Sequence, residues 1–227
     1  MPDIRNMEEF AAVCGISRPT VSKYFQDPQS VRPSIRKRIE TALAKHDYRP
    51  NIFAVNQNRK LTKIVGIVVP FLADPFFAEI ARRLERRCID GGLWPILFSA
   101  HGQPRLETQI LENLRLLKPA GVLLAPLGQA SDRGAIARFC AAAPTVLFDS
   151  NIGDVGTVFV GSDNVDFVDR SVDYLVRTGS PPVFFEMRDP ANPNADKRRD
   201  AFTAAMARHG LPARIVSVPG EGWDFER

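Results

Sequence analysis

The stretch from Ala11 to Lys23 limits the possible folds of this chain more than any other feature. Ala11, Gly15 and Val21 give a small residue, a glycine four positions later and a β-branched residue six positions after the glycine. Two helices that cross at a tight angle need these types, because the small residue lets the backbones approach and the glycine accepts a positive φ in the turn. The spacing therefore predicts a helix-turn-helix, and a plain helical hairpin with a glycine turn is the alternative.

The second helix of this motif has its own start signal. Ser17 can serve as the N-cap, and Pro19 lies in the first turn, where a proline has no hydrogen bond to lose. When such a motif binds DNA, the exposed N-terminal end of this helix enters the major groove. The residues predicted there are Arg18, Pro19, Thr20, Ser22 and Lys23.

Two further helices are predicted in the N-terminal part. Asn6 can cap a helix from Met7 to Cys14, and Glu9 completes a capping box. After a polar loop, Pro33 opens a helix over 34–46 whose apolar positions recur at helical spacing. Residues 52–60 have weak, mixed patterning, which is typical of a linker or of a helix that orders only on a partner.

The charge is distributed unevenly along the chain. Residues 1–63 hold 12 Lys and Arg against 6 Asp and Glu, which leaves 18 against 20 in the remainder of the 30 and 26 in the whole chain. A basic N-terminal part on a near-neutral body indicates that a polyanion is bound at one end only. Three of these cations, Arg36, Lys37 and Arg38, lie near the start of the third helix, where they either face solvent or contact phosphates.

The sequence pattern changes completely at Ile64. A continuous apolar run over 64–70 predicts a buried strand, and strands then alternate with helices, which predicts parallel sheets covered on both faces. The first set has strands at 64–70, 94–99, 121–125 and 145–148 and helices at 76–90, 107–117 and 133–142. The second set has strands at 158–161, 183–186 and 214–218 and helices at 165–178 and 196–209.

Two such sets imply two lobes with a cleft between them. Ligands of parallel sheets bind beyond the C-terminal ends of the strands. In the first lobe these ends are 70–74, 99–103, 125–129 and 149–151. The second set is short and residues 222–227 look like the opening of another helix, so we expect the sequence to be incomplete.

Several functional classes lack their signatures. Cys14, Cys88 and Cys140 form no CxxC pair and are interpreted as reduced core thiols, and the histidines have no ligand-like spacing, so no metal or cofactor is expected. GxGxxG, GxxxxGKS/T and GxSxG motifs are missing from the sequence, so we do not expect an enzyme. A polar N-terminus and the lack of an apolar run of roughly 18 residues predict a cytoplasmic protein instead of a periplasmic receptor.

Together these motifs resemble the lactose/galactose-repressor (LacI/GalR) family of bacterial transcription regulators. The resemblance covers essentially the whole chain. It rests on the helix-turn-helix, on Tyr48-Arg49-Pro50-Asn51, on IVGIVVPFLADPFFAEI from Ile64, on GSDN at 161–164 and on KRRDAF at 197–202.

The resemblance implies an all-α helix-turn-helix headpiece joined to an α/β effector domain like a periplasmic binding protein, with two lobes of parallel sheet and an incomplete second lobe. The expected divisions are a DNA-binding headpiece over 1–50, a hinge or linker over 51–62, an N-terminal lobe over 63–156 and part of a C-terminal lobe over 157–227. The expected function is that of a repressor that binds a palindromic operator in double-stranded DNA as a homodimer. A small ligand in the cleft, expected to be a sugar, would control it. The alternative is a truncated regulator with residual DNA binding and no effector response.

The resemblance also implies roles for individual residues. Arg18, Pro19 and Lys23 fall on base-facing positions of the recognition helix, and Thr20 and Ser22 on positions that contact the groove or phosphates. Tyr48 and Asn51 match positions at the junction of headpiece and hinge, and both are expected, with Gln57, to bind DNA. In the cleft, the positions that commonly touch the ligand are Phe76, Asp149 and Arg198.

Two positions depart from the family pattern. Gln57 stands where many members place a leucine that wedges into the central minor-groove step. Glutamine cannot supply that apolar wedge, although it can hydrogen-bond in the minor groove. Ala201 replaces the usual glycine before an aromatic residue, which is a small change.

Overall fold

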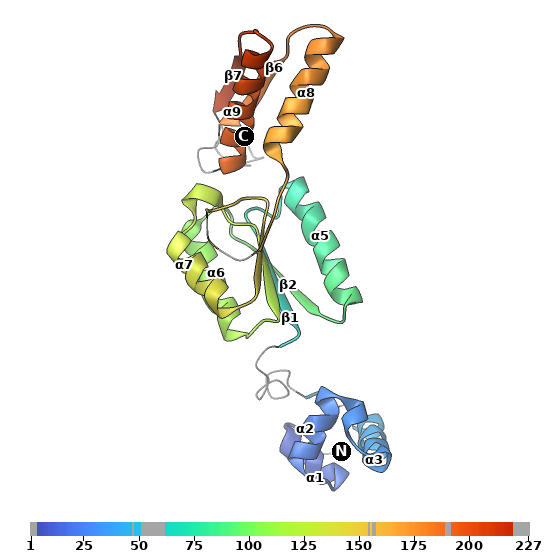
Figure 1. Ribbon diagram of the computed structural model, residues 1–227. Coiled ribbons are helices and arrows are strands. Elements are labelled where there is room, and N and C mark those ends of the chain that lie inside the picture. Colours follow the sequence, from blue (N-terminus) through green and yellow to red (C-terminus); the bar gives the residue numbers. More distant parts are fainter. Residues whose placement is uncertain are drawn as a thin grey trace. The chain divides into compact units, whose positions relative to one another are not determined.

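The computed structural model describes residues 4–46, 48–50, 62–153, 155, 158–188 and 192–219. The chain divides into two compact units, Met1–Thr62 and Lys63–Arg227, which are described separately (Figure 1). Almost all of the hinge predicted over 51–62, including Asn51 and Gln57, lies outside the described residues, as does the helix opening predicted at 222–227.

The first unit contains the three predicted helices. They are α1 (Met7–Cys14), α2 (Arg18–Gln26) and α3 (Pro33–Lys45), with a short 3-10 helix, η1 (Pro28–Ser30), in the polar loop. The side chain of Asn6 accepts a hydrogen bond from the N–H of Glu9 at 2.9 Å, and Glu9 accepts in return from Asn6 Nδ2. Gly15 has φ 62°, so the turn uses the left-handed conformation that the glycine was expected to supply.

An aromatic cluster holds these helices together. The ring of Tyr48 stacks on Phe10 at 4.4 Å between centroids, and Phe25 contacts both rings at 6.0–6.2 Å. Arg38 on α3 donates from Nη2 to the carbonyl oxygens of Cys14 at 2.8 Å and Gly15 at 3.1 Å. Arg38 therefore closes the turn between α1 and α2, which gives this cation a role other than the predicted solvent or phosphate contact.

The second unit begins with a five-stranded parallel sheet in the order β2-β1-β3-β4-β5. In Figure 1, helix α5 (Pro75–Asp90) covers one face, and α6 (Pro104–Leu116) and α7 (Arg133–Ala142) cover the other. The strands are β1 (Ile64–Val69), β2 (Trp94–Ser99), β3 (Gly121–Leu124), β4 (Thr145–Phe148) and β5 (Val158–Val160).

All six residues of β1 are buried, and they serve two separate cores. Ile67 and Val69 pack with Phe77 of α5 on one face. Val68 packs on the other face with residues of α6 and α7, among them Leu114. Continuous burial of a strand on both faces is what a central parallel strand requires.

The placement of β5 differs from the prediction. The sequence pattern groups this strand with the second lobe, but Val158 pairs with Val146 of β4, so the strand extends the first sheet. A strand's own residues do not specify its partner, because any apolar run of this length can pair with any open sheet edge.

The second lobe is built from α8 (Asn164–Thr178), β6 (Val183–Arg188), α9 (Pro193–Arg208) and β7 (Arg214–Pro219). Its two strands pair in parallel, and Phe184 stacks on Phe202 of α9 at 5.2 Å between ring centroids. Phe185 and Met187 alternate along β6 with the half-buried Phe184 and the buried Glu186, and they are 66% and 46% exposed. One face of this sheet is therefore packed and the other is open.

Among the described helices, none has both the length and the apolar character that a membrane span requires.

Gly66 in β1 is expected to be essential for packing. A Cβ at this position would lie 2.9 Å from Leu114 Cδ1 and 3.2 Å from Val122 Cγ2, and Leu114 is fully buried in the core. We expect Gly66→Ala to lower the free energy of unfolding by about 1–3 kcal/mol through overpacking. Urea unfolding measures this loss.

Gly121→Ala is the matched control, because a Cβ on this strand glycine would meet its nearest neighbour at an ordinary 3.4 Å. Equal stability losses in the two variants would contradict the packing argument.

Candidate DNA-binding surface and ligand cleft

Helix α2 has one buried and one open face. Val21 and Tyr24 are buried in the core of the first unit. The five residues predicted to read DNA lie outside that core. Arg18, Pro19 and Lys23 are exposed, and Thr20 and Ser22 are half-buried. The structure places four of them at the N-terminal end of the helix and Lys23 in its last turn.

Ser17 occupies the N-cap position but does not cap with its side chain. Its hydroxyl instead shares a hydrogen bond with the Thr20 hydroxyl at 2.8 Å, and its carbonyl accepts from the N–H groups of Thr20 and Val21. Ser17 is thus the N-cap residue, as predicted, and its hydroxyl is bonded to the Thr20 hydroxyl instead of to a backbone N–H. The contact fixes the position of Thr20 at the helix start.

Tyr48 lies in the core and not on this surface. Its side chain is only 8% exposed and stacks on Phe10. Burial raises the pKa of Tyr48, and the nearby Arg18 guanidinium partly opposes that rise. The structure therefore gives Tyr48 a packing role, and we do not include it among the residues proposed to touch DNA.

The second unit contains a cavity of about 690 Å³ between its two lobes. All four loops at the C-terminal ends of the first-lobe strands contribute to it, as expected for a parallel sheet. The first-lobe lining includes Pro70, Phe71, Asp74, Gly102, Pro126, Leu127 and Asp149, and the second lobe adds Phe184, Phe185, Glu186, Met187, Asn192, Asn194 and Arg198.

The three predicted ligand residues, Phe76, Asp149 and Arg198, all line this one cavity. Phe76 is 50% exposed and meets Phe77 edge-on, with 5.1 Å between ring centroids, so one face of its ring is available for stacking. Asp74 caps α5 by accepting from the Phe76 N–H at 2.8 Å, which fixes the start of the helix that carries this ring.

Asp149 lies at the junction of the two lobes. Its backbone has φ 64°, a left-handed conformation that non-glycine residues rarely adopt. Burial raises the pKa of its carboxyl group, while the Ser150 hydroxyl and the Arg198 guanidinium act to lower it. A carboxylate placed here can accept hydrogen bonds from two hydroxyl groups of a ligand.

A chain of side-chain amides links Asp149 to the second lobe. Asn194 Nδ2 on α9 donates to the Asp149 carbonyl at 3.0 Å, and Asn164 Nδ2 on α8 donates to Asn194 Oδ1 at 3.2 Å. Arg198 Nη1 donates to Asn164 Oδ1 at 3.3 Å. Both asparagines are buried, so these hydrogen bonds satisfy groups that water does not reach. Apart from the GSDN match at 161–164, no sequence pattern indicated this network.

Glu107 on α6 supports a loop that lines the cleft. It is 1% exposed, and its Oε1 accepts from the N–H of Leu127, which lines the cavity. Burial raises the pKa of Glu107, and the Leu127 hydrogen bond opposes that rise. The sequence did not predict the burial of Glu107, because a glutamate on an amphipathic helix is ordinarily interpreted as solvent-exposed.

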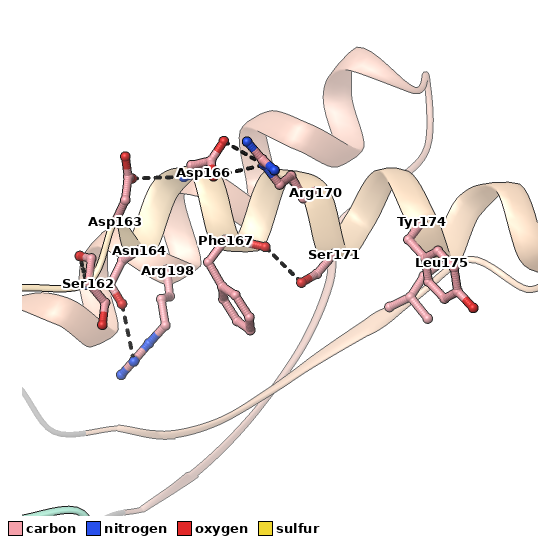
Figure 2. A pocket seen from close by; sticks show the side chains of 10 residues that line it. All are labelled: Ser162, Asp163, Asn164, Asp166, Phe167, Arg170, Ser171, Tyr174, Leu175 and Arg198. Carbon is pink, nitrogen blue, oxygen red and sulfur yellow. Dashed lines mark hydrogen bonds and ion pairs between the residues drawn. The ribbon is translucent and has the colours of Figure 1, made fainter.

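A second hollow of about 840 Å³ runs along α8 (Figure 2). Nearly all of its lining comes from the single segment 162–175, including the exposed side chains of Phe167, Tyr174 and Leu175, and Arg198 completes it. Such a one-sided groove cannot surround a ligand as the cleft does. We therefore assign the candidate ligand site to the cleft.

The described residues contain no group of three or more His, Cys, Asp or Glu side chains arranged to hold a metal ion.

Comparison with known families decides the relationship. Residues 6–51 match the family described as bacterial regulatory proteins, lacI family. Residues 62–224, more than half of the chain, match the periplasmic binding proteins and sugar binding domain of the LacI family. The chain belongs to the LacI family.

Curated relatives of this LacI-family chain are transcriptional regulators. The HTH-type transcriptional regulator PtxS of Pseudomonas plecoglossicida is 27% identical over 216 residues, which are 93% of this chain and 63% of that protein. The ribose operon repressor of Escherichia coli K12 is 24% identical over 90% of this chain and 62% of its own length. The chain thus spans less than two thirds of the length of these two relatives.

Solved LacI-family structures share the fold. A lac repressor dimer bound to operator and the anti-inducer ONPF has a TM-score of 0.79 at 18% identity and covers 95% of this chain and 66% of its own. A CelR–cellobiose complex has a TM-score of 0.57 at 20% identity and covers 95% and 66%. These likenesses agree with the helical headpiece and the parallel α/β unit described above.

The buried carboxyl group of Glu107 predicts a pH-dependent stability difference. The pKa of Glu107 is raised in the folded state, so the carboxyl group contributes its full stabilisation below pH 4.5, its ordinary pKa. That stabilisation is lost as the pH rises through the raised pKa. Glu107→Gln stays neutral and keeps an oxygen that can accept from Leu127. We expect the variant to gain stability relative to wild type between pH 4.5 and 8, measured by urea unfolding across that range.

Glu112→Gln on the exposed side of the same helix is the control and should show no such trend. A Glu107→Gln difference that is constant or shrinks with rising pH would contradict the assignment.

Proposed function

We propose that this chain is a DNA-binding transcription regulator, a repressor whose DNA affinity is controlled by a sugar or related metabolite in the cleft. The observation that carries the proposal is the exposure of Arg18, Pro19 and Lys23 on α2, beside a buried helical core. The relatives of the chain support it, since they include the ribose and sucrose operon repressors. We propose no catalytic activity, and the proposed location is the cytoplasm, where the operator lies.

The headpiece is proposed to read DNA with the N-terminal end of α2 in the major groove. Arg18 can donate two hydrogen bonds to one guanine edge, and Lys23 supplies a second base-facing cation. Pro19 faces the bases beside them. Thr20 and Ser22 contact the groove wall or phosphates. In the hinge, Asn51 and Gln57 are proposed to reach the DNA as well, with Gln57 bonding in the minor groove without an apolar wedge.

The chain is proposed to act as a homodimer on a palindromic operator. The structure of a lac repressor dimer bound to its operator supports this arrangement by likeness of fold. A two-fold symmetric protein places two recognition helices on two half-sites about one helical turn, or a multiple of it, apart.

The cleft is proposed to hold the sugar between the lobes. Asp149 accepts hydroxyl hydrogens, the exposed Phe76 ring packs on a sugar face, and Arg198 donates from the second lobe. A ligand that contacts both lobes changes the equilibrium between lobe arrangements by its difference in affinity for them. That change is proposed to control the DNA-binding state of the headpiece.

Selection from a random duplex pool at near-physiological salt tests the DNA-binding part. We expect the purified chain to enrich one palindromic sequence. If Arg18 is bidentate to guanine, Arg18→Ala should weaken binding to that sequence by about 1–3 kcal/mol and relax preference at one base pair in each half-site.

Lys45→Ala serves as a control, because it removes an exposed cation from the far end of α3. Retention of DNA without enrichment of any sequence would contradict the proposed function. An equal loss on all sequences for Arg18→Ala would make Arg18 a phosphate contact.

Thermal unfolding with D-ribose, sucrose, cellobiose and D-xylulose tests the effector part. We expect at least one of these sugars to raise the melting temperature of the wild-type chain. Asp149→Asn keeps a residue that tolerates positive φ but removes the charge, and should weaken binding of that sugar about tenfold or more, because hydrogen bonds to charged groups contribute about 1.5–3 kcal/mol.

Asp132→Asn provides the matched control, since Asp132 caps α7 and lies outside the cleft lining. An unchanged response of Asp149→Asn would remove Asp149 from the site. A wild-type chain that responds to none of the four sugars would contradict the sugar assignment.

A further inference from the structure

An ion pair joins the two helices of the helix-turn-helix at the proposed reading end. Arg18 Nε, at the first position of α2, lies 3.6 Å from Glu8 Oε2 in the first turn of α1. The side chains are 46% and 80% exposed. An exposed pair of this kind adds little to stability. Because one of its two members, Arg18, is the residue proposed to read a base, the pair can instead affect DNA recognition.

The neighbouring glutamate, Glu9, takes part in the capping of α1. Glu9 accepts from Asn6 Nδ2 and from the backbone N–H of Arg5, and its own N–H is capped by Asn6. Glu8 takes no part in this capping box, and its carboxylate is directed to Arg18 instead. The acidic side chain therefore lies on a basic surface that is proposed to meet a polyanion.

The geometry of the pair leaves the reading edge of Arg18 accessible. The contact is made through Nε, and a guanidinium has five N–H donors in a fixed planar fork. The two terminal nitrogens can therefore approach the O6 and N7 atoms of guanine while Nε stays beside Glu8. The attraction between the carboxylate and Nε also favours those conformations of the long arginine side chain that keep Nε near Glu8.

The same carboxylate opposes contacts with phosphate. Non-specific binding is driven almost entirely by neutralisation of phosphates by Lys and Arg. If Arg18 were bound to a phosphate, Glu8 would be brought within a few ångströms of that like charge, well inside the screening length. In the base-reading position, the guanidinium instead lies between Glu8 and a neutral base edge.

Resting on the proposed DNA-binding function, we propose that Glu8 is a specificity-determining residue that orients Arg18 for a base contact and penalises its use as a phosphate contact.

Glu8→Gln in the full chain tests this proposal. We expect the variant to bind random duplex DNA about threefold to fivefold more tightly than wild type, the scale of one like-charge contact at short range in water. The slope of log affinity against log salt on random DNA should steepen by about 0.9, as for one added phosphate contact. Affinity for the selected sequence should stay equal or fall, so the ratio of specific to random binding decreases.

Glu40→Gln is the matched control, because it removes the same charge from an exposed position on α3. Any effect of net charge alone appears in both variants, and circular dichroism checks that each retains its helices. Equal tightening on random DNA by the two variants would overturn the proposal, and so would a Glu8→Gln affinity for random DNA that is unchanged or weaker.

The double variant Glu8→Gln/Arg18→Gln separates the proposal from the function on which it rests. Without Arg18, the substitution at Glu8 should no longer change the salt slope, and a change that persists would overturn the proposal. A wild-type chain that enriches no sequence would refute sequence-specific reading, and with it the orienting role of Glu8. The comparison of Glu8→Gln with Glu40→Gln on random DNA would still decide the phosphate penalty.

Discussion

Complete burial of β1 is the constraint on which the second unit depends. All six of its residues lie between two helical layers, so every side chain must be apolar or absent. Gly66 has no side chain, and this leaves the space into which Leu114 packs. A strand buried on both faces needs parallel neighbours and crossover helices, and that topology gathers the C-terminal loops at one sheet edge. The position of the cleft therefore follows from the burial of β1, before any ligand residue is considered.

Local signals predicted most of the elements. The bounds of α1, β2, β4 and α7 agree with the prediction, because caps, apolar runs and helical periodicity are read from neighbouring residues. Helices α6 and α9 begin three residues earlier than predicted, each with a proline in the first turn, a start signal that the periodicity alone did not use. One cavity is lined by all four predicted strand-end loops. It is also lined by the three ligand residues that were named from the family resemblance.

The remaining features depend on partners far away in the sequence. The pairing of β5 with β4, the burial of Tyr48 on Phe10 and the support of Leu127 by Glu107 each require tertiary contacts. A tyrosine, a glutamate or an asparagine has the same local pattern whether its partner is water or a buried group. For this reason Asn194, which bonds to Asp149 across 45 residues, was not identified from the sequence.

The amide network sets a limit on how firmly the lobes are joined. Asn194 donates to the Asp149 carbonyl, and of the three hydrogen bonds this one crosses between the lobes, while the bonds of Asn164 to Asn194 and of Arg198 to Asn164 lie within the second lobe. The bond that crosses contributes about 0.5–1.5 kcal/mol net. This lies at the lower end of the roughly 1–3 kcal/mol that couples an effector site to a second site in typical regulators. The sugar proposed to engage Asp149 and Arg198 would need only a comparable difference in affinity between the two lobe arrangements to change their equilibrium, because that difference, and not the affinity itself, sets the change.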